Sequence, residues 1–177
     1  EDQFSVTDRL KLVAGTRTDA IHLDREGFTA TGASNALQTF SQNFTATTWR
    51  AGVVYDVLPE ATVYGQYATA VDPVSSSLFV ARANQKFELA TGMQWEVGAK
   101  GQFWNKRAEW TVAYFDIVRK NILTQISQID ALNVGRQSSK GVELDVAAKL
   151  TDAWRIQGNI TFLSAKFDKF AQLTGGV

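Results

Sequence analysis

The sequence predicts an all-β fold, an antiparallel up-and-down sheet of about eight strands, and three observations predict it. Apolar residues recur at every second position along most of the chain, which is the period of a strand with one apolar face. Short turns and long connections alternate strictly between these stretches. No run of about 18 apolar residues could form a membrane-spanning helix, whereas a transmembrane strand needs only about 10 residues of alternating character.

The first four strands are predicted at about residues 1–6, 10–25, 47–57 and 61–72. In the second, Leu10, Leu12 and Ala14 share one face, and the alternation blurs further along. In the third, apolar or aromatic side chains occupy every second position from Trp49 to Val57. The fourth strand carries apolar residues on both faces, so its orientation is predicted less clearly.

The last four strands are predicted at about residues 93–104, 108–125, 138–150 and 154–168. Alternation is clear in the fifth, from Trp95 to Phe103, and in the seventh, from Val142 to Leu150. The eighth alternates as well, whereas the sixth begins with apolar residues on both faces. Glycine weakens a strand, so close approach or bending of the backbone is the expected compensation at four positions: Gly98, Gly101, Gly141 and Gly158.

Four tight turns of suitable composition join the strands in pairs. They are Thr7-Asp8-Arg9, Leu58-Pro59-Glu60, Asn105-Lys106-Arg107 and Thr151-Asp152-Ala153. Three longer connections lie between the pairs, at about 27–46, 73–92 and 127–137. Short turns on one edge and long loops on the other are the layout of an outer-membrane barrel, in which the short turns are periplasmic.

Aromatic residues fall where the apolar band of such a barrel would meet water. Some lie next to the tight turns and others begin strands on the long-loop side, which predicts two membrane-interface belts. The aromatic residues assigned to these belts are Trp49, Tyr55, Trp95, Trp110 and Trp154.

Charged residues in the same strands fall on the face opposite the apolar stripe. A lysine or arginine at the lipid midplane costs about 2–4 kcal/mol, so this face must meet a wet lumen or a protein plug. The residues predicted to face the lumen are Arg50, Glu96, Lys100, Glu143 and Asp145.

Composition and charge exclude several classes of function. The chain has 18 basic and 18 acidic residues, so no basic footprint for nucleic acid is present. Without cysteine there can be no disulfide, thiolate metal site or cysteine nucleophile in this chain. The single histidine, His22, is expected to be a solvated strand-end residue without a metal or haem role. Glu143 and Asp145 lie about 7 Å apart along one strand face and are expected to line a lumen, so we do not expect an enzyme.

Four stretches from residue 61 onward resemble one family. They are Ala61 to Pro73, Leu89 to Lys100 with a G-x-x-x-E-x-G-x-K pattern, Ala113 to Ile122 with A-x-F-x-I-x-x-x-N, and Gly135 to Asp145 with G-x-x-x-S-x-G-x-E. The turn from Leu150 to Trp154 follows in the expected place. In order and spacing over about 61–168, the chain resembles the TonB-dependent siderophore receptors of the bacterial outer membrane.

The resemblance implies a transporter with a barrel of about 22 strands and a plugged lumen. Such receptors bind a ferric siderophore outside the cell and release it inward with energy delivered by TonB. Residues 1–177 would then be a partial β-barrel domain, because neither a plug nor a TonB box is seen and the end at Leu173 to Val177 lacks the terminal aromatic strand. The resemblance implies no resident cofactor, since iron arrives already chelated, and it implies contact with outer-membrane lipid and with TonB through regions outside this chain.

Two alternatives remain at this point, a self-contained eight-stranded outer-membrane barrel and a soluble β-sandwich binding module. Candidate ligand residues lie in the predicted long loops, where aromatic and cationic side chains occur together. They are Phe79, Arg82, Gln85, Lys86 and Phe87, with Arg136 near the third loop. An anionic ferric chelate would use charge for attraction and aromatic faces for packing. The alternative for these residues is an ordinary role in packing the loops onto the barrel rim.

Overall fold

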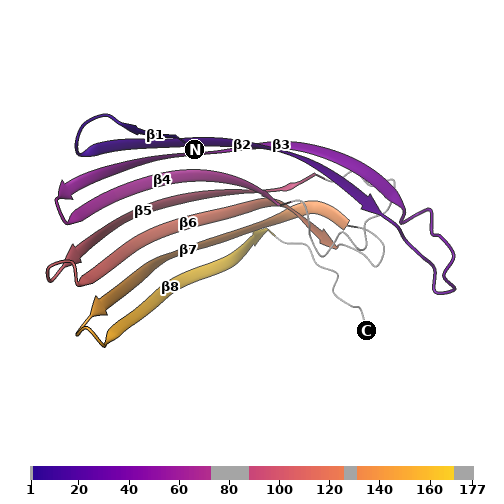
Figure 1. Cartoon of the computed structure of the whole chain (residues 1–177). Helices are drawn as coiled ribbons and strands as arrows, with labels where there is room; N and C mark the ends of the chain where they lie inside the picture. Colours follow the sequence, from indigo (N-terminus) through magenta and orange to yellow (C-terminus); the bar gives the residue numbers. More distant parts are fainter. Residues whose placement is uncertain (1, 73–87, 126–130, 170–177) are drawn as a thin grey trace.

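The computed structural model describes residues 2–72, 88–125 and 131–169 as one eight-stranded sheet. Each strand pairs antiparallel with its neighbour in the chain, so the spatial order is β1 to β8 without a crossover (Figure 1). The strands are β1 (Asp2–Ser5), β2 (Leu10–Arg25), β3 (Phe40–Leu58), β4 (Ala61–Asp72), β5 (Ala90–Phe103), β6 (Ala108–Gln125), β7 (Ala131–Lys149) and β8 (Arg155–Lys169). None of the described residues belongs to a helix with the length and apolar character needed to cross a membrane.

All four predicted tight turns join strands at one edge of the sheet, and the connection between β2 and β3 lies at the opposite edge (Figure 1). The turn after β5 has left-handed backbone at three successive residues. Trp104, Asn105 and Lys106 all adopt left-handed backbone with φ of 55°, 53° and 63°. The Arg107 N–H closes this turn by donating to the Trp104 carbonyl at 3.1 Å. The edge with the tight turns is called the short-turn rim below, and the opposite edge the long-loop rim.

Two strands begin earlier than the sequence predicts. β3 begins at Phe40 rather than about 47, and β7 begins at Ala131 rather than about 138, so the predicted loops 27–46 and 127–137 are wrong over these stretches. In β3 the added residues pair with the far half of β2, where polar side chains face each other on the outer side; His22 Nδ1 lies 2.6 Å from Asn43 Oδ1. Beyond the band the apolar side chains of this pair, such as Ile21 opposite Phe44, lie on the other face, so the alternation of the band does not continue there.

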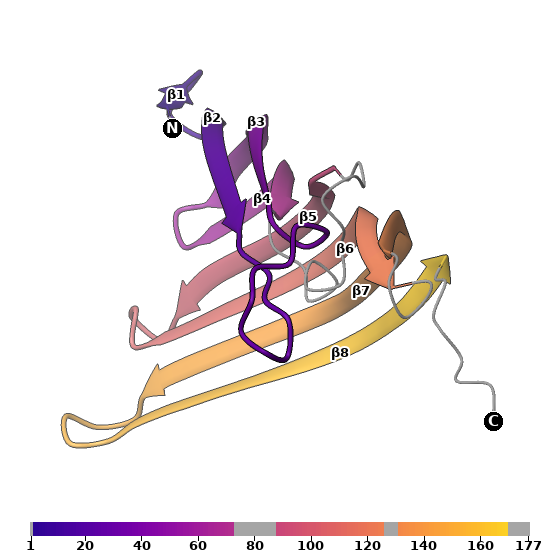
Figure 2. The same ribbon diagram turned by 90° about the vertical axis from the view of Figure 1, so that its right-hand side faces the viewer.

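The cross-strand register separates the side chains onto two faces. One face, called the outer face, carries an exposed apolar row that includes Val53, Val63, Val97, Leu144 and Ile160. The opposite face, called the inner face, carries most of the charged residues of the strands, and the sheet curls as it runs from β1 to β8 (Figure 2). No large side chain among the described residues is fully buried. The sheet therefore has no core of its own, and its apolar face needs a covering that is not water.

Aromatic side chains on the inner face pack directly over strand glycines. A Cβ at Gly98 would lie 2.6 Å from the Tyr64 ring, and a Cβ at Gly141 would lie 2.9 Å from the Phe115 ring. These two glycines are therefore places of close approach, as the sequence predicts. Gly158 is different, because nothing lies within 4 Å of the position its Cβ would take.

Candidate functional site

The inner face is organised around Glu96 on β5. The Tyr64 hydroxyl donates to Glu96 Oε1 at 2.9 Å, and the Gln94 amide donates to Glu96 Oε2 at 2.9 Å. Both carboxylate oxygens are thus held, one from β4 and one from the same strand. Hydrogen bonds to an ionised group are stronger than neutral ones, so this arrangement fixes a negative charge at a defined place on the inner face.

A second polar group links three strands near the short-turn rim. Lys11 Nζ on β2 lies 3.4 Å from Asp56 Oδ2 on β3, and the Thr62 hydroxyl on β4 donates to Asp56 Oδ1 at 2.8 Å. The group is half-exposed, and such pairs contribute at most about 1 kcal/mol each. Its main effect is to hold the side chains of neighbouring strands in one arrangement.

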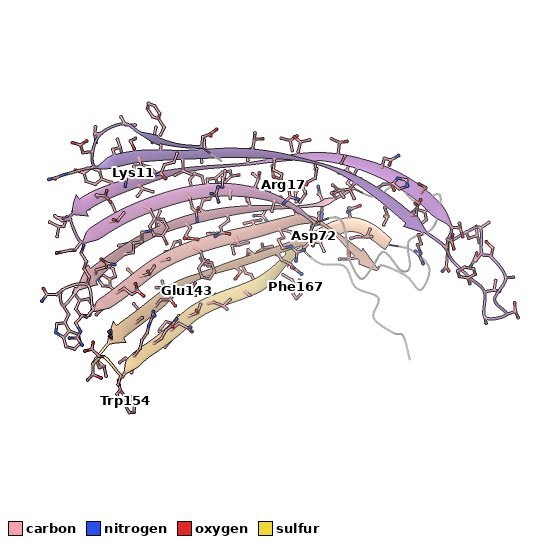
Figure 3. All side chains as sticks on the ribbon, in the orientation of Figure 1. Lys11, Arg17, Asp72, Glu143, Trp154 and Phe167 are labelled. Carbon is pink, nitrogen blue, oxygen red and sulfur yellow. The ribbon has the colours of Figure 1, made fainter. Side chains whose placement is uncertain are left out.

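The inner face forms a hollow near the long-loop rim, between β6, β7 and β8. It has a volume of about 240 Å³, and its lining includes Ile117, Arg119, Gln137, Ser139 and Phe167. Arg119 also pairs with Asp72 at the end of β4, with 2.6 Å between Nη2 and Oδ2. Figure 3 shows Asp72 and Phe167 toward this rim and Trp154 at the opposite one. The hollow combines an apolar wall with a guanidinium group, which is the chemistry that an anionic, partly aromatic ligand would use.

Asn133 braces the same rim. Its amide donates to the backbone carbonyls of Asn121 at 2.6 Å and Glu88 at 3.0 Å, and its carbonyl oxygen accepts the Glu88 N–H at 2.9 Å. Asn121 itself has left-handed backbone with φ of 54°, at an irregular point in the pairing of β6 with β7. The brace ties β7 to Glu88, two residues ahead of β5, and to Asn121 of β6.

The five residues predicted to face the lumen all lie on the inner face: Arg50, Glu96, Lys100, Glu143 and Asp145. Only Glu96 belongs to the group around Tyr64. Lys100 and Asp145 both lie opposite Thr111, one on each neighbouring strand. Contact with a wet lumen or a plug remains a prediction for these residues.

Of the six candidate ligand residues, the structure describes only Arg136. Phe79, Arg82, Gln85, Lys86 and Phe87 lie outside the described residues. Arg136 lies within β7 and not in a loop, and its side chain pairs with Asp168 of β8, with 3.4 Å between Nε and Oδ2. The loop position expected for Arg136 is wrong because β7 begins earlier than predicted.

Sequence analysis missed Tyr64, Gln94, Arg119 and Asn133. The one available signal is Tyr64, an aromatic residue on the polar side of a strand, which makes the alternation of residues 61–72 imperfect. Its partner Glu96 is 32 residues away, and the pairing follows from the β4–β5 register, which composition does not reveal.

Of the aromatic residues predicted for the membrane interfaces, Trp49, Tyr55, Trp95 and Trp110 lie on the outer face, and Trp154 lies in the turn just ahead of β8. Trp49, Tyr67 and Trp95 form a row on β3, β4 and β5, with ring centroids 4.9 Å and 4.5 Å apart. On β5, Trp95 and Phe103 mark the two rims of the apolar face. At a strand rise of about 3.4 Å and a tilt of about 40°, they are separated by roughly 20 Å in height, close to the apolar band of an outer-membrane barrel.

His22 lies on the part of β2 beyond this band, outside the membrane-spanning region. Its Nδ1 is 2.6 Å from Asn43 Oδ1, and its Nε2 is 2.9 Å from Asp24 Oδ2. The hydrogen bond to Asn43 and the charge of Asp24 raise the pKa of His22. Among the residues that the structure describes, no cluster of three or more His, Cys, Asp or Glu could hold a metal ion.

A sheet with an apolar outer face of this height, aromatic rims and a charged inner face defines a class of protein. It is the wall of a transmembrane β-barrel, with lipid on one side and a polar interior on the other.

The family follows from comparison with known proteins. Residues 1–176 match the family described as TonB dependent receptor-like, beta-barrel, and the chain belongs to this family of outer-membrane transport receptors. The probable TonB-dependent siderophore receptor PiuA of Acinetobacter baumannii is 27% identical over 175 residues, which are 95% of this chain and 23% of that protein. The ferrioxamine B receptor of Salmonella typhimurium is 28% identical over 96% of this chain and 23% of its own length.

Solved structures agree with this assignment. The crystal structure of the siderophore receptor PiuA from Acinetobacter baumannii matches with a TM-score of 0.85 and 25% identity, covering 96% of this chain and 25% of that chain. The ferric-catecholate import receptor Fiu from E. coli has the same fold over 94% of this chain and 27% of its own, with a TM-score of 0.79 and 21% identity. This chain thus spans about a quarter of the length of its relatives and forms part of the wall of a large outer-membrane barrel.

Proposed function

We propose that the receptor to which this chain contributes takes up a ferric siderophore across the outer membrane, with energy from TonB. The observation that carries the proposal is the match along nearly the whole chain to receptors whose names specify siderophores. The plug, the TonB contact and the remaining strands would be supplied by regions outside residues 1–177. The role is transport and not catalysis.

The chemistry of the inner face supports a chelated cargo. Iron would enter inside its siderophore, so the wall needs polar and aromatic contacts with the chelate and no metal ligands of its own. The hollow with Arg119 and Phe167 offers both kinds of contact at the long-loop rim. In barrels of this type the long loops are extracellular, so the hollow would face the side from which cargo arrives.

A growth experiment tests the function. A strain lacking the intact receptor is grown on iron-limited medium with ferrioxamine B or a ferric catecholate as the only iron source, because both chemistries occur among the named relatives. The receptor gene should restore growth and labelled-iron uptake on at least one of them, and a proton uncoupler should abolish the uptake. Iron uptake that is the same with and without the receptor on every chelate would refute the proposal.

The loop residues Phe79, Arg82, Gln85, Lys86 and Phe87 are proposed cargo contacts. In the intact receptor, the double variant Arg82→Ala, Lys86→Ala should weaken ferric-chelate binding severalfold, because two charge-assisted contacts are lost. A matched control, Arg9→Ala with Lys106→Ala, removes the same charge from the short-turn rim. Equal affinity of the two double variants for the chelate would assign the loop residues a packing role only.

A further inference from the structure

The ion pair between Asp72 and Arg119 reaches across a whole strand. Asp72 ends β4 and Arg119 lies on β6, so β5 runs between them. Adjacent strands lie about 4.8 Å apart, which separates the two backbones by roughly 10 Å. The side chains nevertheless meet, with 2.6 Å between Nη2 and Oδ2, because the inner-face positions of β5 between them carry only Ala90 and Gly92. Small residues on β5 therefore leave the space in which this pair forms.

The same arginine supplies the charge of the neighbouring hollow. Of the inner-face residues that line the hollow, only Arg119 is charged; the full set is Ile117, Arg119, Gln137, Ser139, Ala165 and Phe167. Lys166 contributes to the lining from an outer-face position and pairs with Asp168 at 3.5 Å. One guanidinium group thus has two neighbours, a carboxylate at the end of β4 and an uncharged, partly aromatic hollow between β6 and β8.

The Asp72–Arg119 pair is accessible to water and open to exchange. Both side chains are 44% exposed, and ion pairs with such access to water contribute about 0–1 kcal/mol. An anion in the hollow that contacts Arg119 must either replace Asp72 or bind beside it. Replacement costs the existing ion pair, and binding beside it brings two negative charges close together. In both cases Asp72 weakens the binding of an anion, whereas it favours a cation.

We propose that Asp72 is an internal competitor for cargo and sets the charge selectivity of the hollow. Asp72 engages Arg119 in the absence of cargo, so an anionic aromatic chelate has to compete with it. For a cationic chelate the same carboxylate offsets the charge of Arg119, and the hollow accepts the chelate without repulsion. The inference rests on the proposed function, because it names the property of the cargo that this part of the wall distinguishes, which is net charge.

Two small aromatic probes that differ in charge test the proposal. Salicylate carries a carboxylate, and salicylamide has the same ring with an uncharged amide. Binding of each probe to the purified intact receptor in detergent is measured by ligand-observed NMR. In Asp72→Asn the competing carboxylate is gone, so the affinity for salicylate should rise about tenfold, while the affinity for salicylamide should stay within about twofold. The gain should shrink at high salt, which screens the charges.

Two further variants show where the gain arises. Asp56→Asn is the matched control, because Asp56 is also an ion-paired carboxylate on the inner face, 3.4 Å from Lys11 Nζ but near the short-turn rim. It should leave the affinity for salicylate within about twofold. Adding Arg119→Gln to Asp72→Asn should remove the preference for salicylate over salicylamide, because the guanidinium group that attracts the carboxylate is lost.

The expected result is a gain of affinity, which misfolding of a variant cannot imitate. The proposal is overturned if Asp72→Asn changes the affinity for both probes equally, if Asp56→Asn has the same effect, or if the Asp72→Asn receptor binds no salicylate. Uptake of ferrioxamine B and of a ferric catecholate by the unmodified receptor is scored separately. Failure of the transport function and failure of the competition between Asp72 and the anion can therefore be told apart.

Discussion

Arginine at the centre of the outer face is the sharpest test of the two-faced sheet. Val112 on β6 pairs with Ala99 on β5 and with Leu144 on β7. Ala99 lies midway between Trp95 and Phe103, so Val112 occupies the middle of the apolar band. Its neighbour Thr111 has nearly the same size and shape but lies on the inner face. Val112→Arg and Thr111→Arg therefore place the same side chain one residue apart on opposite faces.

The expected magnitude follows from depth. The band is roughly 20 Å high on β5, so Val112 lies about 10 Å from either rim, beyond easy reach of water for most of an arginine side chain. Arginine at the midplane costs about 2–4 kcal/mol, and a value near 3 kcal/mol lowers the folding equilibrium more than a hundredfold. At position 111 the new guanidinium would lie between Lys100 and Asp145, whose charges oppose each other, and the cost should stay below about 1 kcal/mol.

The measurement is a folding titration of the intact receptor in phosphatidylcholine vesicles. The folded fraction is read from the heat-modifiable gel shift across a urea series, for the unmodified receptor and each variant. Ile156→Arg, near the short-turn rim, adds a depth control that should cost only about 0–1 kcal/mol. Equal costs at positions 111 and 112, or a larger cost at 111, would refute the assignment of the two faces.

Three further predictions concern packing, hydrogen bonding and access. Gly98→Ala should destabilise the receptor by about 1–3 kcal/mol in the same titration, because its Cβ would lie 2.6 Å from the Tyr64 ring; Gly158→Ala, with open space around it, should change little, and equal effects would contradict the close approach. Tyr64→Phe should cost about 1 kcal/mol, because Glu96 loses a donor on a partly exposed face; a stability equal to that of the unmodified receptor would show that the bond contributes nothing. Spin labels at Val97 should be relaxed by oxygen dissolved in lipid, and labels at Glu96 by a water-soluble reagent. The reverse pattern would show that the face assigned to lipid is the one that meets water.

The strand order, the turns and the two faces of the membrane band were predictable from the sequence because lipid imposes a strict rule there. Every second residue from Trp95 to Phe103 faces lipid or the membrane interface and must be apolar, aromatic or small. This requirement produces a period of two residues that can be recognised in the sequence. Beyond the band both faces of a strand meet water. The early residues of β3 and β7 follow no such rule, and their strand pairing was missed for that reason.

The inner face could be predicted only in part. The side of the sheet on which Glu96 and Lys100 lie follows from alternation within one strand. The contact between Tyr64 and Glu96 depends instead on which residues of β4 and β5 lie opposite each other, and the turn after β4 is too long to fix that register. For the same reason Gly98 could be recognised as a place of close approach without identifying the ring that covers it.

The pairing of every strand with its chain neighbours alone has a consequence for how such a wall is made. No strand of the described sheet pairs with a distant part of the polypeptide, so the sheet can lengthen by one neighbouring strand at a time from an existing edge. At each step the unpaired N–H and C=O groups of the edge strand are available to pair with the next strand. Such an edge would promote aggregation of a soluble protein, but here it is the site at which the sheet grows. A change that slows the addition of one strand should therefore delay only the strands that are added to the edge later.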